Sequence, residues 1–167
     1  FCNSVGSIIN LNDSLSGNSI VGTWLETTGS SSFDPSTGVF DGSGLGGQYD
    51  FTYTVTSSAP CISDVADFSV TVNENPTVNP GPVPAILCDE DFAFLVGNPL
   101  GGTTPYIAHT WLELGTPGLT NTMIQNPVFD AVPTGQGSFD LTYTVTDANS
   151  CTGSGNMTVL VKSKLPC

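Results

Sequence analysis

The amino-acid sequence predicts an all-β protein made of two tandem β-sandwich domains of one kind. The first observation is a strand pattern that occurs twice, as Tyr-Asp-Phe-Thr-Tyr-Thr-Val-Thr at 49–56 and as Phe-Asp-Leu-Thr-Tyr-Thr-Val-Thr at 139–146. Apolar side chains alternate with Asp or Thr in both copies, which is the period of a strand with one buried face. The second observation is a cysteine at the same distance after each copy, Cys61 and Cys151. The third is the absence of helical periodicity, with turn signals about every 8–12 residues.

The expected elements follow the same order in both domains, and each domain has one tryptophan that we expect in its core. In the first domain the strand-like segments are 5–11, 20–26 with Trp24, 33–34, 39–40, 49–56 and 68–72. In the second domain they are 92–96, the segment around Trp111, 129–130, 139–146 and 157–161.

The repeat sets the expected domain boundaries, because 167 residues would suit either one domain or two. We expect domain 1 at 1–72, a linker at 73–84, domain 2 at 85–162, and a tail or the start of a following repeat at 163–167. Four prolines in the linker predict a semi-rigid extended spacer. The chain opens abruptly at Phe1-Cys2 without a signal peptide, so we expect a mature or excised piece of a longer protein.

The charge balance restricts the partners that the protein can have. Only two residues are basic and fifteen are acidic, which gives a net charge of −13. Such a surface argues against nucleic acid or an anionic membrane as a partner. No apolar run approaches membrane-spanning length, so membrane insertion is not expected. Five cysteines without a Cys-x-x-Cys pair favour disulfides in an oxidising compartment over a zinc site.

No pattern in the chain favours an enzyme. His109 is the only histidine, and it has no cysteine motif or second histidine with which to hold a metal or activate a nucleophile. No Gly-x-Ser-x-Gly sequence is present, and the scattered carboxylates cannot be paired from sequence. The alternating aromatics Tyr49, Phe51 and Tyr53 could form a sugar-binding platform if they faced outward, but their alternation with Asp and Thr favours the core.

These motifs in this order resemble the Ig-like, PKD-like repeats of large secreted surface proteins of Bacteroidetes-type bacteria, including gliding-motility adhesins. The segments that carry the resemblance are 22–24 (Gly-Thr-Trp), 33–35 (Phe-Asp-Pro), the repeated strand with the cysteine after it, and 101–106 (Gly-Gly-Thr-Thr-Pro-Tyr). The resemblance implies two tandem Ig-like β-sandwich domains without catalysis of their own. It also implies export by the type IX secretion system to the cell surface.

The function that this resemblance implies is that of an extracellular stalk or fibre segment, structural and adhesive. Expected partners are neighbouring repeats, copies of the protein in a fibre, and surface glycans or other cells. The alternative is a pair of carbohydrate-binding modules from a secreted enzyme. Aromatic side chains exposed together on one sheet face would favour the alternative, whereas aromatics buried in the core would favour the stalk.

An Ig-like fold would also determine how the cysteines pair. If the start of the first strand and the loop after the penultimate strand lie at one end of each domain, Cys2 can meet Cys61, and Cys88 can meet Cys151. Four cysteines allow three pairings, and this one respects the repeat. Cys167 is then left over, as a free thiol, the first cysteine of a following repeat, or a link to another chain.

Two further sites are expected on surface loops. In an Ig-like domain, Asp89 and Asp91 would lie at the same end as Asp147, so their oxygens could hold Ca²⁺; a solvated acidic patch is the alternative. Ser14 lies in Asp13-Ser14-Leu15, which is similar to the O-glycosylation acceptor of Bacteroidetes-type bacteria. An unmodified turn serine is the alternative there.

Overall fold

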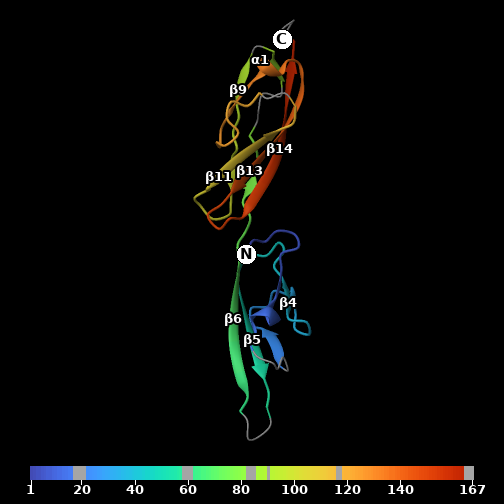
Figure 1. Cartoon of the computed structure of the whole chain (residues 1–167), viewed down its shortest axis with the longest axis vertical. Coiled ribbons are helices and arrows are strands. Elements are labelled where there is room, and N and C mark those ends of the chain that lie inside the picture. Colours follow the sequence, from blue (N-terminus) through green and yellow to red (C-terminus); the bar gives the residue numbers. More distant parts are fainter. Residues whose placement is uncertain (17–21, 58–61, 82–85, 90, 116–117, 164–167) are drawn as a thin grey trace. The chain divides into compact units, whose positions relative to one another are not determined.

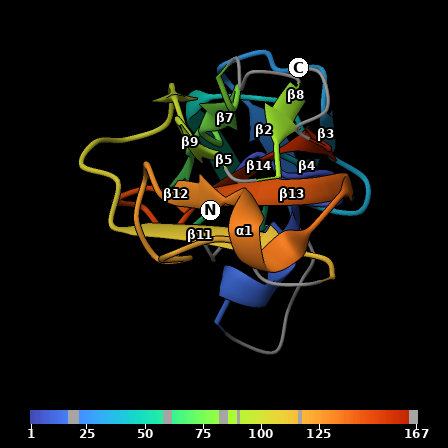
Figure 2. The same cartoon turned by 90° about the horizontal axis from the view of Figure 1, so that it is seen from above.

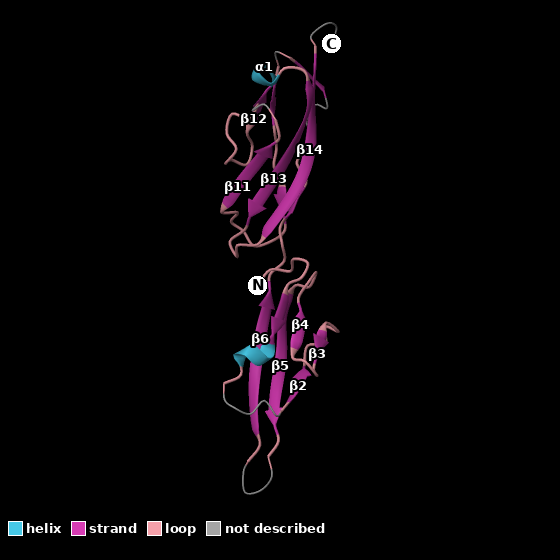
Figure 3. Cartoon of the chain, turned by 45° about the vertical axis from the view of Figure 1, so that its right-hand side comes forward, coloured by secondary structure: helices cyan, strands magenta, loops and turns pink. Residues whose placement is uncertain are grey.

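The computed structural model describes residues 1–16, 22–57, 62–81, 86–89, 91–115 and 118–163. The chain folds as two compact units, unit 1 (Phe1–Glu74) and unit 2 (Asn75–Cys167). The regular secondary structure in the described part of each unit is almost entirely β-strand, shown in magenta in Figure 3. Each unit is an Ig-like β-sandwich, which confirms the predicted fold class.

Unit 1 has two three-stranded sheets, β1-β4-β3 and β2-β5-β6. Its strands are β1 (Ile8–Asn10), β2 (Thr23–Glu26), β3 (Phe33–Asp34), β4 (Val39–Asp41), β5 (Gly47–Val55) and β6 (Asp64–Val72), with the short 3₁₀ helix η1 (Leu11–Ser14). The long antiparallel hairpin of β5 and β6 dominates the unit (Figure 1).

Unit 2 has one four-stranded sheet, β11-β13-β14-β8, and two two-stranded sheets, β12-β9 and β10-β7. Its strands are β7 (Thr77–Val78), β8 (Ile86–Cys88), β9 (Phe92–Phe94), β10 (Pro99–Leu100), β11 (Ala108–Glu113), β12 (Val128–Asp130), β13 (Gly137–Thr146) and β14 (Thr152–Lys162). The helical turn α1 (Ala131–Thr134) leads into β13, beside which it lies in Figure 2. The Asp130 carboxylate accepts the Val132 N–H and so caps this turn.

The repeated strand forms the centre of both cores, as its alternation predicted. Trp24 lies opposite Tyr53 across β2 and β5, and Trp111 lies opposite Tyr143 across β11 and β13. These four side chains are buried, together with others that share the inward-facing positions. The additional core residues include Phe40, Phe51, Val70 and Val72 in unit 1 and Leu95, Phe129, Leu141, Val145, Val159 and Val161 in unit 2.

The structure divides the chain within the segment that the sequence suggested as a linker, 73–84. Thr77–Val78 pairs with Pro99–Leu100, so this part of the segment is a strand of unit 2. Prolines are compatible with such a strand where their missing N–H is not needed by a ladder. Pro76 and Pro80 lie on either side of this strand, whereas Pro82 and Pro84 lie outside the described residues.

Candidate functional site

The three aspartates suggested as a calcium site lie at opposite ends of unit 2. The Asp91 carboxylate accepts the N–H of Cys88, which lies opposite Lys162 at the last position of β14. Asp147 precedes Thr152, the first residue of β14. A strand of that length spans roughly 33 Å. The predicted calcium site of Asp89, Asp91 and Asp147 is therefore wrong, because β8 ends beside the last residue of β14, and Asp89 and Asp91 follow it there.

Asp147 instead organises the turn between β13 and β14. It is the buried acidic side chain of the described core, at 0% exposure. One carboxylate oxygen accepts the N–H groups of Asn149 at 2.9 Å and Cys151 at 2.8 Å, and the other accepts the Thr103 N–H at 2.8 Å. A buried carboxylate is tolerated when backbone donors satisfy it in this way. Its role is structural.

The same strand order overturns the expected pairing of cysteines in unit 2. Cys88 lies beside Lys162 at the end of β14, whereas Cys151 lies just before the start of β14. Disulfides join Cα atoms that are less than about 7 Å apart. The predicted Cys88–Cys151 bond is therefore wrong, because β8 runs parallel to β14 and Cys88 lies at the end of β14 that is opposite to Cys151.

Unit 1 excludes the other expected pair for the same reason. Cys2 forms a parallel bridge with Asn73, just past the end of β6. Cys61 lies outside the described residues, but its neighbour Ile62 precedes Asp64 at the other end of β6. The nine residues of β6 span about 30 Å, so the predicted Cys2–Cys61 bond is also wrong.

Disulfides are nevertheless present in the structure. Cys2, Cys88 and Cys151 are each disulfide-bonded, which confirms the expectation of disulfide bonds. Cys167, like Cys61, lies outside the described residues.

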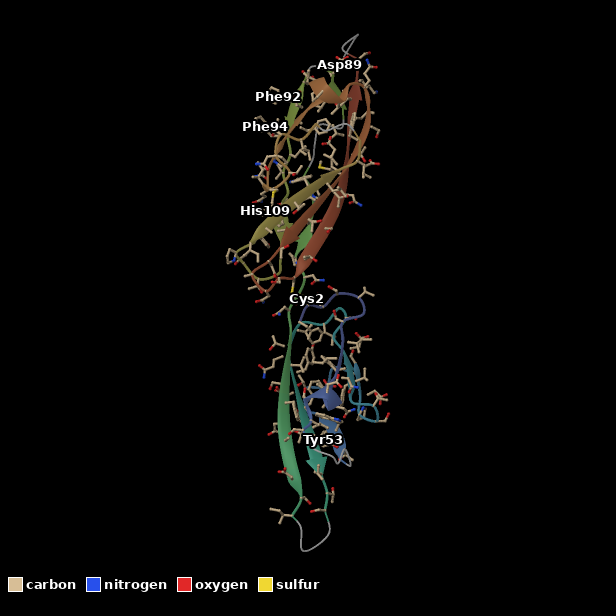
Figure 4. All side chains as sticks on the ribbon, in the orientation of Figure 1. Cys2, Tyr53, Asp89, Phe92, Phe94 and His109 are labelled. Carbon is tan, nitrogen blue, oxygen red and sulfur yellow. The ribbon has the colours of Figure 1, made fainter. Side chains whose placement is uncertain are left out.

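His109 is a packed structural histidine, as its isolation in the sequence predicted. Its Nδ1 lies 2.6 Å from the Tyr143 hydroxyl, and the two rings are stacked. Burial, with a smaller contribution from Tyr106, raises the pKa of Tyr143 to about 12. Figure 4 shows His109 within unit 2 and Tyr53, the counterpart of Tyr143, within unit 1. The sequence did not predict this histidine–tyrosine pair, since His109 and Tyr143 are 34 residues apart.

Two aromatic side chains that the sequence did not single out are exposed on unit 2. Phe92 and Phe94 on β9 are 62% and 69% exposed and point out from the ribbon in Figure 4. Val96 continues the same alternation at 45% exposure. The two rings meet edge to face, with an interplanar angle of 89°. Phe92, Phe94 and Val96 alternate in the sequence with the buried residues Ala93 and Leu95. This alternation was the sequence signal from which the exposed apolar side chains could have been predicted.

The exposed acids of unit 1 are held by neighbouring hydroxyl groups. A hydrogen bond from the Ser36 side chain lowers the pKa of Asp34, and one from Ser43 lowers the pKa of Asp41. The Ser69 hydroxyl, followed by Gln48, lowers the pKa of Asp50. These bonds fix turns and a strand pair, and none of them prepares a carboxylate for proton transfer.

The described residues contain no cluster of three or more His, Cys, Asp or Glu side chains with metal-binding geometry. In the same part of the chain, no helix combines the length and the apolar character needed to span a membrane. Ser14, the suggested glycan acceptor, is exposed at the end of η1. Its position is accessible, and whether it is modified stays a prediction.

Comparisons with known proteins give a likeness of fold. Neither protein-family models nor curated protein sequences match the chain. Among solved structures, the fibronectin(III)-like modules of CbhA from Clostridium thermocellum are similar over 91% of this chain and 85% of theirs, at 12% identity and a TM-score of 0.41. The protocadherin GammaB4 extracellular domain is similar over 84% of this chain and 25% of its own, at 11% identity and a TM-score of 0.34. The cadherin-like domains 1 to 4 of zebrafish RET are similar over 85% of this chain and 41% of theirs, at 14% identity and a TM-score of 0.25.

Proposed function

We propose that the chain is a non-catalytic, extracellular structural and adhesive segment of a bacterial cell-surface protein. The observation that carries the proposal is that the described side chains which could take part in chemistry instead stabilise the interior of their own sandwich. Asp147 binds backbone N–H groups, His109 binds Tyr143, and the repeated aromatic strand lies in the core. Disulfides suit a compartment outside the cytoplasm.

Export by the type IX system and assembly into a stalk or fibre complete this proposal. They are supported by the resemblance of both repeats to surface proteins of Bacteroidetes-type bacteria. In a fibre, the partners would be neighbouring repeats or other copies of the chain, and its ligands would be surface glycans or other cells. O-glycosylation at Ser14 fits the same setting, and intact-mass measurement of natively produced protein would detect the added sugar.

Labelling of intact cells tests the location. An antibody against the chain should label unpermeabilised cells, and the label should be lost in a strain without type IX secretion. Electron microscopy of the sheared surface material should then show filaments that carry the antibody. Label that appears only after permeabilisation would overturn the proposal.

The exposed pair Phe92 and Phe94 favours a second candidate, a carbohydrate-binding module. A sugar ring stacks best on a flat aromatic face, and the edge-to-face arrangement of these two rings provides a poor platform. The stalk therefore remains the better-supported function. Glycan-array binding that is lost in Phe92→Ala and kept in Phe68→Leu, a partly buried control in unit 1, would reverse this order.

A further inference from the structure

The sheet β1-β4-β3 of unit 1 carries an open groove on its outer face. Ile9, Phe33 and Phe40 belong to the core on the inner face, so their neighbours along these strands point outward. Figure 3 shows β3 and β4 side by side. The groove has a volume of about 530 Å³. It is lined by apolar residues (Ile8, Val39), acidic residues (Asp34, Asp41) and serines (Ser31, Ser32).

The two carboxylates of the groove are diagonal neighbours on this face. Asp34 lies opposite Val39, and Asp41 is the next outward-facing residue along β4. Diagonal positions of this kind are about 7–8 Å apart. The Oδ1 atoms of the two aspartates accept the N–H groups of Ser36 and Ser43, each at 2.9 Å. An ionised carboxylate accepts about four hydrogen bonds, so each aspartate can still bind a donor from a ligand.

The charge of the groove favours a cationic ligand. The hydrogen bonds from Ser36 and Ser43 that lower the pKa values of Asp34 and Asp41 keep both carboxylates charged at neutral pH. Unit 1 has no lysine, arginine or histidine in its sequence with which to neutralise them. The groove therefore suits a ligand that brings two positive charges about 7 Å apart, on stems that can cover its apolar lining.

The chain itself contains one segment with these properties. Its two lysines both lie in Val-Lys-Ser-Lys-Leu at 161–165. Lys162 is exposed at the end of β14, and Lys164 lies outside the described residues. In an extended strand, residues two apart project from the same face at a separation of about 7 Å, which matches the spacing of the aspartates. Lysine stems are aliphatic and can lie on apolar surface while their ammonium groups reach a carboxylate.

We propose that the groove of unit 1 binds the segment 161–165 of a second copy of the chain, with one lysine paired to each of Asp34 and Asp41. The contact joins two different surfaces, so it can be repeated from copy to copy. It rests on the proposed function, because it names another copy in a fibre as the partner. Exposed ion pairs are individually weak, so a single contact should have a Kd on the order of 1 mM, and an array of copies would strengthen it.

The probe is a peptide of residues 161–166 (Val-Lys-Ser-Lys-Leu-Pro) with both ends blocked, titrated into the full-length chain and followed by NMR. We expect saturable shifts in the residues of the groove, Ile8, Ser32, Asp34, Val39 and Asp41. Binding should weaken about tenfold in 0.5 M NaCl, because salt screens exposed ion pairs. A peptide with glutamine at both lysine positions should not bind.

A second diagonal pair of aspartates in unit 1 provides the matched control. Asp50 and Asp67 are diagonal neighbours across β5 and β6, and neither lines the groove. Asp34→Asn combined with Asp41→Asn should weaken binding by about tenfold or more, whereas Asp50→Asn combined with Asp67→Asn should leave it within about twofold. Asparagine keeps the side-chain oxygen that accepts the N–H of Ser36 or Ser43, so both turns of the groove are retained.

Three results would overturn the proposal: equal weakening in the two double variants, shifts located outside the groove, or no saturation by the native peptide. Equal weakening would mean that the peptide responds to the overall negative charge of the chain and not to the groove. Surface labelling of cells would be unaffected by any of these results, so the proposed function is tested separately.

Discussion

The two units share a similar eight-residue strand. Buried polar side chains beside this strand have hydrogen-bond partners in unit 2, whereas their counterparts in unit 1 have none among the described residues. Tyr143 bonds to His109, whereas its counterpart Tyr53 faces Gly22, which has no side chain to offer. Asp147 binds three backbone N–H groups at the start of its turn. Its counterpart Ser57 has a buried hydroxyl with no partner among the described residues. The repeated apolar pattern therefore determines how the strands pair. The residues around it determine whether the buried polar groups of each unit find hydrogen-bond partners.

The largest expected effect is at Asp147. Asp147→Ala leaves three backbone N–H groups without their acceptor in a buried turn, so it should destabilise unit 2 by roughly 3–5 kcal/mol. Ser57→Ala, the matched change in unit 1, should stay within about 0.5 kcal/mol. Urea unfolding followed by tryptophan fluorescence measures both. Equal effects in the two units would remove the proposed difference between their turns.

The contact of the Pro76–Val78 segment with the start of β14 in unit 2 gives the next effect. Gly153→Ala introduces a Cβ that overlaps the Pro76 carbonyl, so we expect a loss of about 1–3 kcal/mol. Asp64→Ala, the matched change in unit 1, alters an exposed residue and should be nearly neutral. If Gly153→Ala proved as harmless as Asp64→Ala in the same urea experiment, Pro76 would not lie against β14 in solution.

The two tyrosines should respond differently to loss of the hydroxyl. Tyr143→Phe leaves the Nδ1 of His109 without its partner and should cost about 1 kcal/mol. Tyr53→Phe removes a hydroxyl that bonds to no described residue, so unit 1 should be unchanged or slightly more stable. Thermal unfolding of the two variants checks the sign, and a clear destabilisation by Tyr53→Phe would show that its hydroxyl has a partner.

The smallest effects concern pH, and they affect the two units in opposite directions. The pKa values of Asp34, Asp41 and Asp50 are lowered in folded unit 1, so their stabilisation is present above the ordinary range near 4 and is lost as the pH falls through the folded values. The pKa of Tyr143 is raised to about 12 in folded unit 2, so its stabilisation is present below pH 10 and is lost between about 10 and 12. Tyr143→Phe should abolish the alkaline loss, and Asp50→Asn should weaken the acid one.

The sequence predicted the fold because alternation is a local property of the chain. The period of two around Tyr53 and Tyr143 and the positions of Trp24 and Trp111 indicate strands and core without any knowledge of topology. The prolines of the segment 73–84 predict an extended backbone, which a spacer and an edge strand share, and Thr77–Val78 of this segment is a strand in the structure.

The site predictions failed where they depended on which ends of the strands meet. The pairing of Cys88 with Cys151 and the calcium site at Asp89 both assumed that the first strand begins beside the turn after β13. The structure shows that Cys88 lies at the opposite end of β14, and strand order of this kind is not contained in the spacing of residues. Non-reducing peptide mapping should accordingly recover neither Cys2 joined to Cys61 nor Cys88 joined to Cys151.

Separate unfolding of the two units tests the central claim. In unit 2 the segment at Pro76–Val78 covers the start of β14, whereas in unit 1 the start of β6 is exposed. Each unit has one buried tryptophan, so Trp24→Phe leaves Trp111 to report unit 2, and Trp111→Phe leaves Trp24 to report unit 1. With disulfides intact, we expect Trp24 to report unfolding at a lower urea concentration than Trp111, after correction for the stability change that each substitution causes. Coincident transitions, or unit 2 unfolding first, would contradict the claim.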